Sequence, residues 1–162
     1  MKKDRARIVV DGRTYFAAGV LPVCNGMCCV MISTNRGLEL PGGKVELFDK
    51  DLFDTAQRET IEETNGLCKP QKVNVLQEIY DWRFKYALFV VKVDKSQVLP
   101  SDAYGRTETH TGVKREVKWI PISEFEDLIC QRDCKKLRVF DMRQHTGRAL
   151  HRFLHTHKAC RV

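Results

Sequence analysis

The chain has 162 residues, of which 43% are hydrophobic and 30% are charged, with a formal net charge of +7 at pH 7. This composition fits one globular domain over residues 1–162 and excludes a disordered or fibrous chain. No apolar run approaches the roughly 20 residues that cross a bilayer, and the basic N-terminus leads into no signal-peptide core. We therefore expect an intracellular protein without a membrane segment, in the cytoplasm or, as an open alternative, in the nucleus.

The first part of the chain predicts strands joined by tight turns. A hairpin over residues 7–16 is closed by Asp11-Gly12, a two-residue turn signal. The apolar runs 17–23 and 28–33 have the length of strands and are separated by Asn25-Gly26, a second turn signal.

A loop at 35–37 and a short segment at 38–40 follow these strands. The triplet Pro41-Gly42-Gly43 is then expected to interrupt regular structure, because proline lacks a backbone N–H and glycine tolerates positive φ.

Residues 51–64 predict a helix, with Asp51 as its N-cap and Asn65-Gly66 as its C-terminal stop. The remaining predicted elements are strands at 73–80, 86–93 and 116–120, a long polar loop at 94–114, and helices at 125–130 and about 137–157. Strands before, between and after helices indicate an α/β domain of the α+β type, with a mixed sheet covered by helices.

The seven cysteines are expected to be reduced, because the sequence shows no secretory signal; an odd number also cannot pair off completely within one chain. Zinc sites usually contain Cys-x-x-Cys pairs, and the C-terminal cysteines and histidines lack this spacing. We interpret the following as ordinary helix and tail residues: Cys130, Cys134, His151, His155, His157 and Cys160.

Three carboxylates lie on the predicted helix that follows Pro41-Gly42-Gly43. Glu59, Glu62 and Glu63 have helical spacing that brings them to one face, where they repel one another. A hard divalent cation such as Mg²⁺ relieves this repulsion and binds carboxylates together with substrate phosphates. Arg58 lies four residues before Glu62 and can hold part of the cluster, while Gly42-Gly43 lets backbone groups approach a metal or phosphate. A solvated acidic helix face beside a plain glycine turn is the alternative, and the combination in this order favours a site.

These residues resemble the Nudix box, Gly-x5-Glu-x7-Arg-Glu-U-x-Glu-Glu-x-Gly-U with U apolar, over Gly43 to Leu67. The resemblance to the Nudix hydrolase superfamily implies an α/β/α sandwich that hydrolyses a diphosphate bond in nucleoside diphosphate-linked compounds, with Mg²⁺ or Mn²⁺ as cofactor. It also implies metal-binding carboxylates at Glu59, Glu62 and Glu63 and a metal-binding backbone carbonyl at Gly42. Relatives are often dimers, so a homodimer is an open alternative.

The sequence departs from the Nudix pattern at three places. One extra residue precedes Arg58, so the first glutamate of the pattern falls on Asp49 when counted forward and on Lys50 when counted backward. Thr60 stands at an apolar position. Asn65 replaces the glycine, which is a conservative change because asparagine also accepts the left-handed conformation at a helix end. None of these departures removes a metal ligand.

A carboxylate must accept the proton of the attacking water. We favour Glu63 as this base or as a ligand that orients it, and expect the catalytic group to be Glu63, Glu59 and Arg58. Glu108 is a further candidate base, and Glu116 is a candidate base or additional metal ligand. For both, a solvated loop or strand-edge position is the plainer interpretation.

The net positive charge favours an anionic substrate, although a generally basic surface would give the same balance. Arg36 and Lys44 flank the box loop and are candidate phosphate contacts. Trp82, Phe84 and Tyr86 alternate along a predicted hairpin and could stack on a base, although such alternation is more often packing. Suitable substrates are a dinucleoside polyphosphate, a nucleoside triphosphate or capped RNA.

Three classes of function remain open from the sequence. We favour an active Nudix pyrophosphohydrolase, because a non-catalytic module has no need of three mutually repelling carboxylates. A Nudix-fold module that binds RNA or a nucleotide, and a basic interaction protein with an incidental acidic helix, are the other two. Lys114-Arg115-Glu116 is also similar to a segment of diphosphoinositol polyphosphate hydrolases, which adds an inositol pyrophosphate to the candidate substrates.

Overall fold

The computed structural model of the chain describes residues 4–33, 37–130 and 145–156. In chain order the elements are β1 (Ile8–Val10), β2 (Arg13–Tyr15), β3 (Ala17–Cys24), β4 (Met27–Ser33), β5 (Gly37–Glu39), β6 (Gly42–Lys44), α1 (Leu52–Glu63), η1 (Lys72–Asn74), β7 (Val75–Asp81), β8 (Tyr86–Lys92), η2 (Lys95–Gln97), η3 (Ser101–Tyr104), β9 (Glu116–Pro121), α2 (Ile122–Cys130) and α3 (His145–Thr156), where η marks a 3₁₀ helix.

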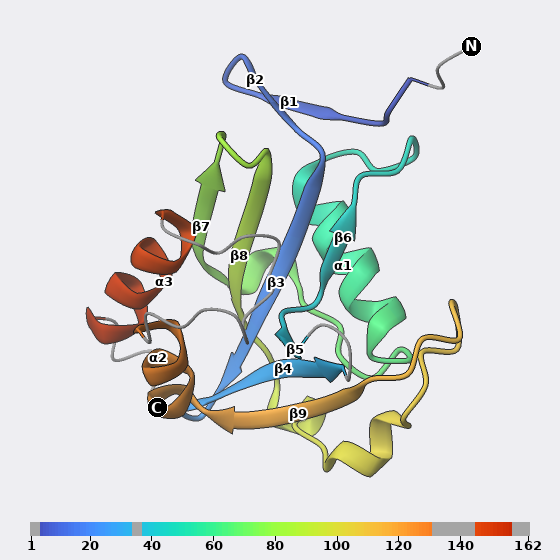
Figure 1. The fold of residues 1–162 in the computed structure, drawn as a ribbon, viewed down its shortest axis with the longest axis vertical. Coiled ribbons are helices and arrows are strands. Elements are labelled where there is room, and N and C mark those ends of the chain that lie inside the picture. Colours follow the sequence, from blue (N-terminus) through green and yellow to red (C-terminus); the bar gives the residue numbers. More distant parts are fainter. Residues whose placement is uncertain (1–3, 34–36, 131–144, 157–162) are drawn as a thin grey trace.

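The central layer is a seven-stranded mixed sheet. Its strand order is β5-β4-β3-β8-β7, with β6 paired to β3 and β9 paired to β4. The β3–β8 pair is parallel and the other pairs of this sheet are antiparallel. β1 and β2 form a separate hairpin above the sheet in the view of Figure 1.

Helices cover both faces of the sheet, with α1 on one side and α2 and α3 on the other (Figure 1). Alternate residues of β3 explain this arrangement, since successive side chains of a strand point to opposite faces. Ala18 and Val20 pack in the cluster that contains Phe53 of α1, whereas Leu21 and Val23 pack with α2 and α3. The predicted α/β/α sandwich with a mixed sheet is therefore confirmed.

The turns that the sequence predicted are present. Asp11 and Gly12 have φ of 50° and 75°, and Asn25 and Gly26 have φ of 49° and 75°. Asn65 at 52° and Gly66 at 80° follow the C-terminal end of α1. Each pair accepts the left-handed backbone conformation that its turn requires.

The prediction that residues 41–43 interrupt regular structure is wrong for the two glycines. Gly42 and Gly43 lie in β6, with Gly42 opposite Gly19 and Gly43 opposite Ala18 of β3. A Cβ at Gly42 would lie 2.7 Å from the Gly19 Cα atom and 2.8 Å from the Ala18 carbonyl oxygen. Gly42 is thus required for the close approach of two backbones rather than for positive φ.

Other element boundaries differ from the sequence predictions by a few residues. The predicted strand at 73–80 begins at Val75, after η1, and the helix predicted from 125 begins at Ile122. The long polar loop contains η2 and η3, and of the helix predicted at 137–157 the residues 137–144 and 157 lie outside the described ranges. None of the helices in the described ranges combines the length and apolarity needed to cross a membrane.

Candidate active site

The helix α1 is fixed in place by its cap and its apolar side. The Asp54 amide donates to Asp51 Oδ1 at 2.8 Å, which satisfies one of the free N–H groups at the first turn. Leu52, Phe53 and Ala56 are buried against β3 and β8. With this side of α1 in the core, its glutamates lie beside β6.

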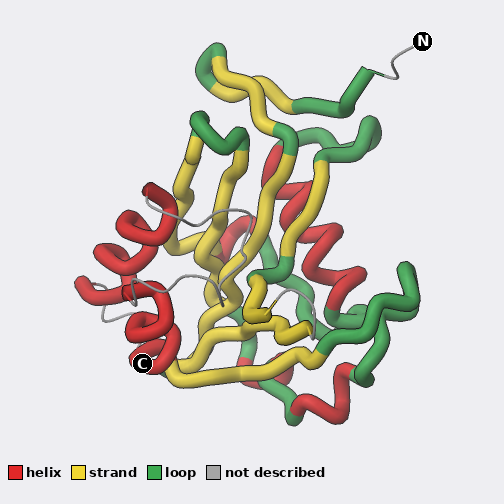
Figure 2. Tube along the Cα trace, in the orientation of Figure 1, coloured by secondary structure: helices red, strands yellow, loops and turns green. Residues whose placement is uncertain are grey.

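Carboxylates from α1 and from the loop between β8 and β9 line one pocket of about 350 Å³. The pocket residues are Glu39, Leu40, Gly42, Gly43, Lys44, Glu46, Arg58, Glu59, Glu62, Glu63, Glu108, His110 and Thr111. The loop that contains Glu108 therefore meets β6 and α1 here, although it lies more than 40 residues after them in the sequence. Figure 2 shows this loop beside the C-terminal end of α1.

Two carboxylates of α1 lie against the glycines of β6. A Cβ at Gly43 would lie 2.3 Å from Cδ of Glu59 and 2.5 Å from each of its carboxylate oxygens. The Gly42 amide donates to Glu63 Oε2 at 3.4 Å. The missing side chain of Gly43 therefore leaves room for the Glu59 carboxylate, while Gly42 contacts Glu63 through its backbone amide.

Arg58 organises one side of the pocket. Its guanidinium donates to both oxygens of Asp49, at 3.1 and 3.0 Å, to Glu59 Oε1 at 2.9 Å and to the Lys44 carbonyl at 2.9 Å. The Glu62 carboxylate lies farther away, at 3.6 Å. Arg58 therefore links the loop after β6 to the helix and orients Glu59.

The structure shows what each of the two residues at the first-glutamate position contacts. The Asp49 side chain pairs with Arg58, whereas the Lys50 amide donates to Asp54. Of the two, Asp49 is therefore the one whose side chain joins the loop to the arginine of the box. Burial alone would raise the pKa of Asp49, but hydrogen bonds from Arg58, the Glu46 amide and Thr55 lower it below its ordinary value.

The departure at Thr60 is also explained. Its side chain is fully buried, and its hydroxyl donates to the Ala56 carbonyl at 2.7 Å. A threonine at this apolar position therefore leaves no polar group unsatisfied.

The pocket has more negative charge than its cations neutralise. Burial raises the pKa of Glu63 well above its ordinary value, and the carboxylates of Glu59 and Glu108 raise it further. Burial also raises the pKa of Glu59, against the opposing effect of Arg58. A cation in the pocket would favour the ionised form of these groups.

Asn65 fastens the loop that contains Glu108 to the end of α1. Its Nδ2 donates to the carbonyls of Tyr104 and Thr107 at 2.9 and 3.0 Å, and its Oδ1 accepts the Thr109 amide at 2.9 Å. The residue that replaces the glycine of the box therefore does more than accept positive φ, because its amide determines where Glu108 lies.

Arg115 and Tyr104 fix the base of the same loop. Arg115 is buried and donates to the carbonyls of Glu63 at 2.9 Å, Gly105 at 2.7 Å and Tyr104 at 3.3 Å. The Tyr104 hydroxyl accepts the Trp119 indole N–H at 2.9 Å and donates to the Gln97 carbonyl. The loop therefore rests on the core at one end and on α1 at the other.

Most residues that the sequence singled out meet in this pocket. They are Gly42, Lys44, Arg58, Glu59, Glu62, Glu63 and Glu108. Arg36 lies outside the described residues. The sequence did not single out His110, whose Nε2 lies 3.9 Å from Glu62 Oε2, and its position two residues after Glu108 was the available signal.

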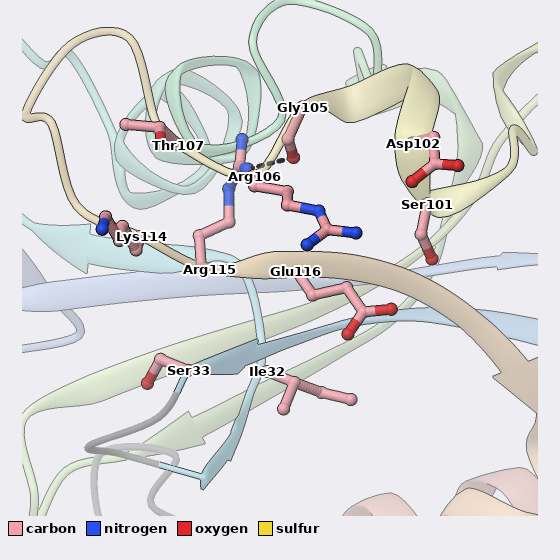
Figure 3. Close-up of a pocket in the computed structure, with 10 residues that line it drawn as sticks. All are labelled: Ile32, Ser33, Ser101, Asp102, Gly105, Arg106, Thr107, Lys114, Arg115 and Glu116. Atoms are coloured by element: carbon pink, nitrogen blue, oxygen red, sulfur yellow. Dashed lines mark hydrogen bonds between the residues drawn. The ribbon is translucent and has the colours of Figure 1, made fainter.

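Glu116 lines a different cavity of about 570 Å³, together with Ile32, Ser33, Ser101, Asp102, Gly105, Arg106, Thr107, Lys114 and Arg115 (Figure 3). In Figure 3 the side chains of Arg115 and Glu116 leave the chain in opposite directions, with Arg115 directed at the Gly105 carbonyl. Glu108, and not Glu116, is thus the later carboxylate that accompanies the helix glutamates.

The carboxylate oxygens of the pocket are of the type that binds a metal ion, but they do not converge on one point. Within the described part of the chain, no three histidine, cysteine, aspartate or glutamate side chains converge closely enough to hold one. The donors that line the pocket are nevertheless carboxylate oxygens, which are the ligands that Mg²⁺ and Mn²⁺ prefer. In chemical type this donor set fits a hard divalent cation.

A family model described as the NUDIX domain matches residues 14–140. The chain belongs to the Nudix family of hydrolases, which act on nucleoside diphosphate derivatives and generally use divalent metals. No curated protein matched the sequence significantly.

Proposed function

We propose that the protein is a Mg²⁺-dependent pyrophosphohydrolase that cleaves a diphosphate bond in a nucleotide or polyphosphate. The observation that carries the proposal is the meeting of Glu59, Glu62, Glu63 and Glu108 with the backbone of β6 in one pocket. If the glutamates of α1 served only as a solvent-exposed polar face, the fold would have no reason to bring Glu108, a further carboxylate, next to them.

The residues that would hold the cation are Glu59, Glu62, Glu63 and the carbonyl of Gly42. Bound there, Mg²⁺ or Mn²⁺ would screen the charge of the diphosphate and make the attacking water more acidic. Arg58 acts as a positioning residue, since Asp49 and Glu59 already occupy its guanidinium. Lys44 is exposed at the pocket and is available to a phosphate oxygen.

Glu63 is our choice for the group that accepts the proton of water. Its carboxylate lies in the pocket with those of Glu59, Glu62 and Glu108, within reach of a water that the cation would hold. The Gly42 amide, at 3.4 Å, orients one of its oxygens. Glu108 is only 8% exposed, lines the same pocket and is the second candidate.

The first experiment is incubation with Mg²⁺ and a mixed panel, with products identified by mass spectrometry. The panel contains nucleoside triphosphates, dinucleoside polyphosphates, ADP-ribose, capped RNA and an inositol pyrophosphate. We expect cleavage at a diphosphate bond that is abolished by chelation. Binding of RNA or nucleotide without any cleavage would contradict the proposal and favour a non-catalytic module.

Variants identify the base. We expect Glu63→Gln to lower turnover about 10²- to 10⁴-fold, the usual contribution of a general base. Glu124→Gln is the matched control, because Glu124 is exposed on α2 and lies outside the pocket. Loss of turnover in Glu108→Gln with full turnover in Glu63→Gln would reassign the base to Glu108.

A further inference from the structure

An exposed surface lies where the chain entering β3 meets the turn between β7 and β8. The Lys85 carbonyl accepts the amides of Phe16 at 2.9 Å and Ala17 at 3.4 Å, which joins the two segments. We define the cationic aromatic surface as Arg5, Arg13, Phe16, Trp82, Arg83 and Lys85. In Figure 1 this region lies at the end of the sheet nearest the β1–β2 hairpin.

Cations lie over both rings of this surface. The guanidinium carbons of Arg13 and Arg83 lie 4.6 and 5.5 Å from the centre of the Trp82 ring. Over Phe16, the Arg5 guanidinium carbon lies at 4.3 Å and the Lys85 ammonium nitrogen at 5.2 Å. Each ring thus has one cation from the segment before β3 and one from the turn between β7 and β8.

Packing does not account for these rings. Trp82 is 48% exposed and Phe84 beside it is 47% exposed. Among the described residues, neither belongs to any of the three hydrophobic clusters. Phe16 is half-buried and lies outside these clusters as well. Exposed cation–ring contacts are weak, so folding alone gives little reason to leave a tryptophan in solvent.

The charge of the surface selects an anionic partner. Residues 4–16 and 82–85 contain the cations Arg5, Arg7, Arg13, Arg83 and Lys85 against the carboxylates Asp4 and Asp11. Exposed aromatic faces next to cations are the combination that binds single-stranded nucleic acid, because bases stack on rings and guanidinium planes while phosphates meet the cations. In a duplex the base faces are stacked on one another, so a duplex could contact only the cations of this surface and not its rings.

The surface is continuous with β6. The Val45 amide donates to the Phe16 carbonyl at 2.9 Å, and Lys44 of the pocket lies opposite Ala17. We propose that the cationic aromatic surface binds a single strand of nucleic acid. This proposal does not depend on the proposed hydrolysis, since it concerns residues outside the carboxylate pocket.

Fluorescence anisotropy with a labelled 12-nucleotide RNA tests the proposal. The titration is done in EDTA, so that no turnover occurs, and is repeated with single-stranded DNA of the same sequence and with the duplex. We expect both single strands to bind more tightly than the duplex. We expect Trp82→Ala to weaken RNA binding about 10-fold, from the loss of one stacked base, and Trp82→Phe to retain most of the affinity.

A matched pair of double variants distinguishes binding at the cationic aromatic surface from a general effect of the protein's net charge. Arg13→Ala/Arg83→Ala and Lys92→Ala/Lys118→Ala each remove two positive charges, and all four side chains are exposed. Only the first pair should reduce the salt dependence of binding, by a slope of roughly 0.7 for each phosphate that the protein no longer neutralises. Equal losses of affinity in both pairs, unchanged binding by Trp82→Ala, or tighter binding of the duplex would each overturn the proposal. Thermal unfolding of every variant verifies that the fold is intact.

Discussion

Replacing Gly43 by alanine should remove activity while leaving the fold intact. The new Cβ would lie 2.3 Å from Cδ of Glu59, so the carboxylate must move by roughly 1 Å to reach ordinary contact. A displacement of this size in a catalytic group costs on the order of 100-fold in rate, which corresponds to about 2.7 kcal/mol of transition-state stabilisation.

The effect of Gly43→Ala on stability should be close to zero. Weakening the partly exposed Arg58–Glu59 pair costs about 1 kcal/mol or less. Replacing a strand glycine by alanine returns roughly 0.5–1 kcal/mol, because glycine loses more conformational freedom on folding. The two effects offset each other.

Gly42→Ala is the contrasting variant. Its Cβ would meet backbone atoms of Gly19 and Ala18, at 2.7 and 2.8 Å, and backbone cannot rotate aside as a carboxylate can. We expect a loss of roughly 1–3 kcal/mol in the free energy of unfolding. Thermal denaturation, steady-state hydrolysis and Mg²⁺ titration calorimetry compare the two variants. Full activity in Gly43→Ala, or equal destabilisation of both variants, would refute this account of β6.

Three further predictions concern other residues. Asn65→Gly keeps the left-handed conformation but removes three hydrogen bonds to the loop that contains Glu108. We therefore expect kcat/KM to fall about 10-fold. Asn25→Gly, at nearly the same φ, should leave kcat/KM unchanged in the same assay. Asp49→Asn should lower the free energy of unfolding at pH 7 by roughly 2 kcal/mol, because Asp49 pairs with Arg58. The folded pKa of Asp49 is lowered, so this stabilisation is present above the unfolded pKa of about 4 and should disappear as the pH falls through the folded value; urea titrations at pH 7 and pH 3 that show an equal difference would contradict it. Burial raises the pKa of the Cys68 thiol to about 12, so iodoacetamide at pH 8 should modify Cys68 only after unfolding. Alkylated Cys68 in the native protein, detected by mass spectrometry, would contradict this prediction.

Local signals in the sequence predicted a mixed sheet covered by helices and the helix half of the site, and the resemblance to the Nudix family added the α/β/α sandwich. Asn-Gly and Asp-Gly favour the tight turns whose two central residues have positive φ, so the hairpins followed from neighbouring residues alone. The shared face of Glu59, Glu62 and Glu63 followed from helical spacing. These features depend on contacts within a few residues, which is the range over which a single sequence is informative.

The other half of the site depends on long-range contacts. Asn65 and the Tyr104 carbonyl are 39 residues apart, and Arg115 and the Glu63 carbonyl are 52 residues apart. No periodicity links such positions, so the sequence favoured Glu116 as the additional metal ligand, whereas the fold brings Glu108 to the helix glutamates. The same reason explains β6, since Gly42 becomes a strand residue only because Gly19 is its partner.

The way the loop between β8 and β9 is anchored has a consequence for how this protein can change. Tyr104 is bound to the core through Trp119, and Arg115 is bound to the end of α1. Residues 106–114 lie between these two fixed points and contribute Glu108, His110 and Thr111 to the pocket. Insertions or exchanges at the tip would therefore alter one wall of the proposed active-site pocket at little cost to the sheet, and selection for a new substrate would be expected to act first on this segment.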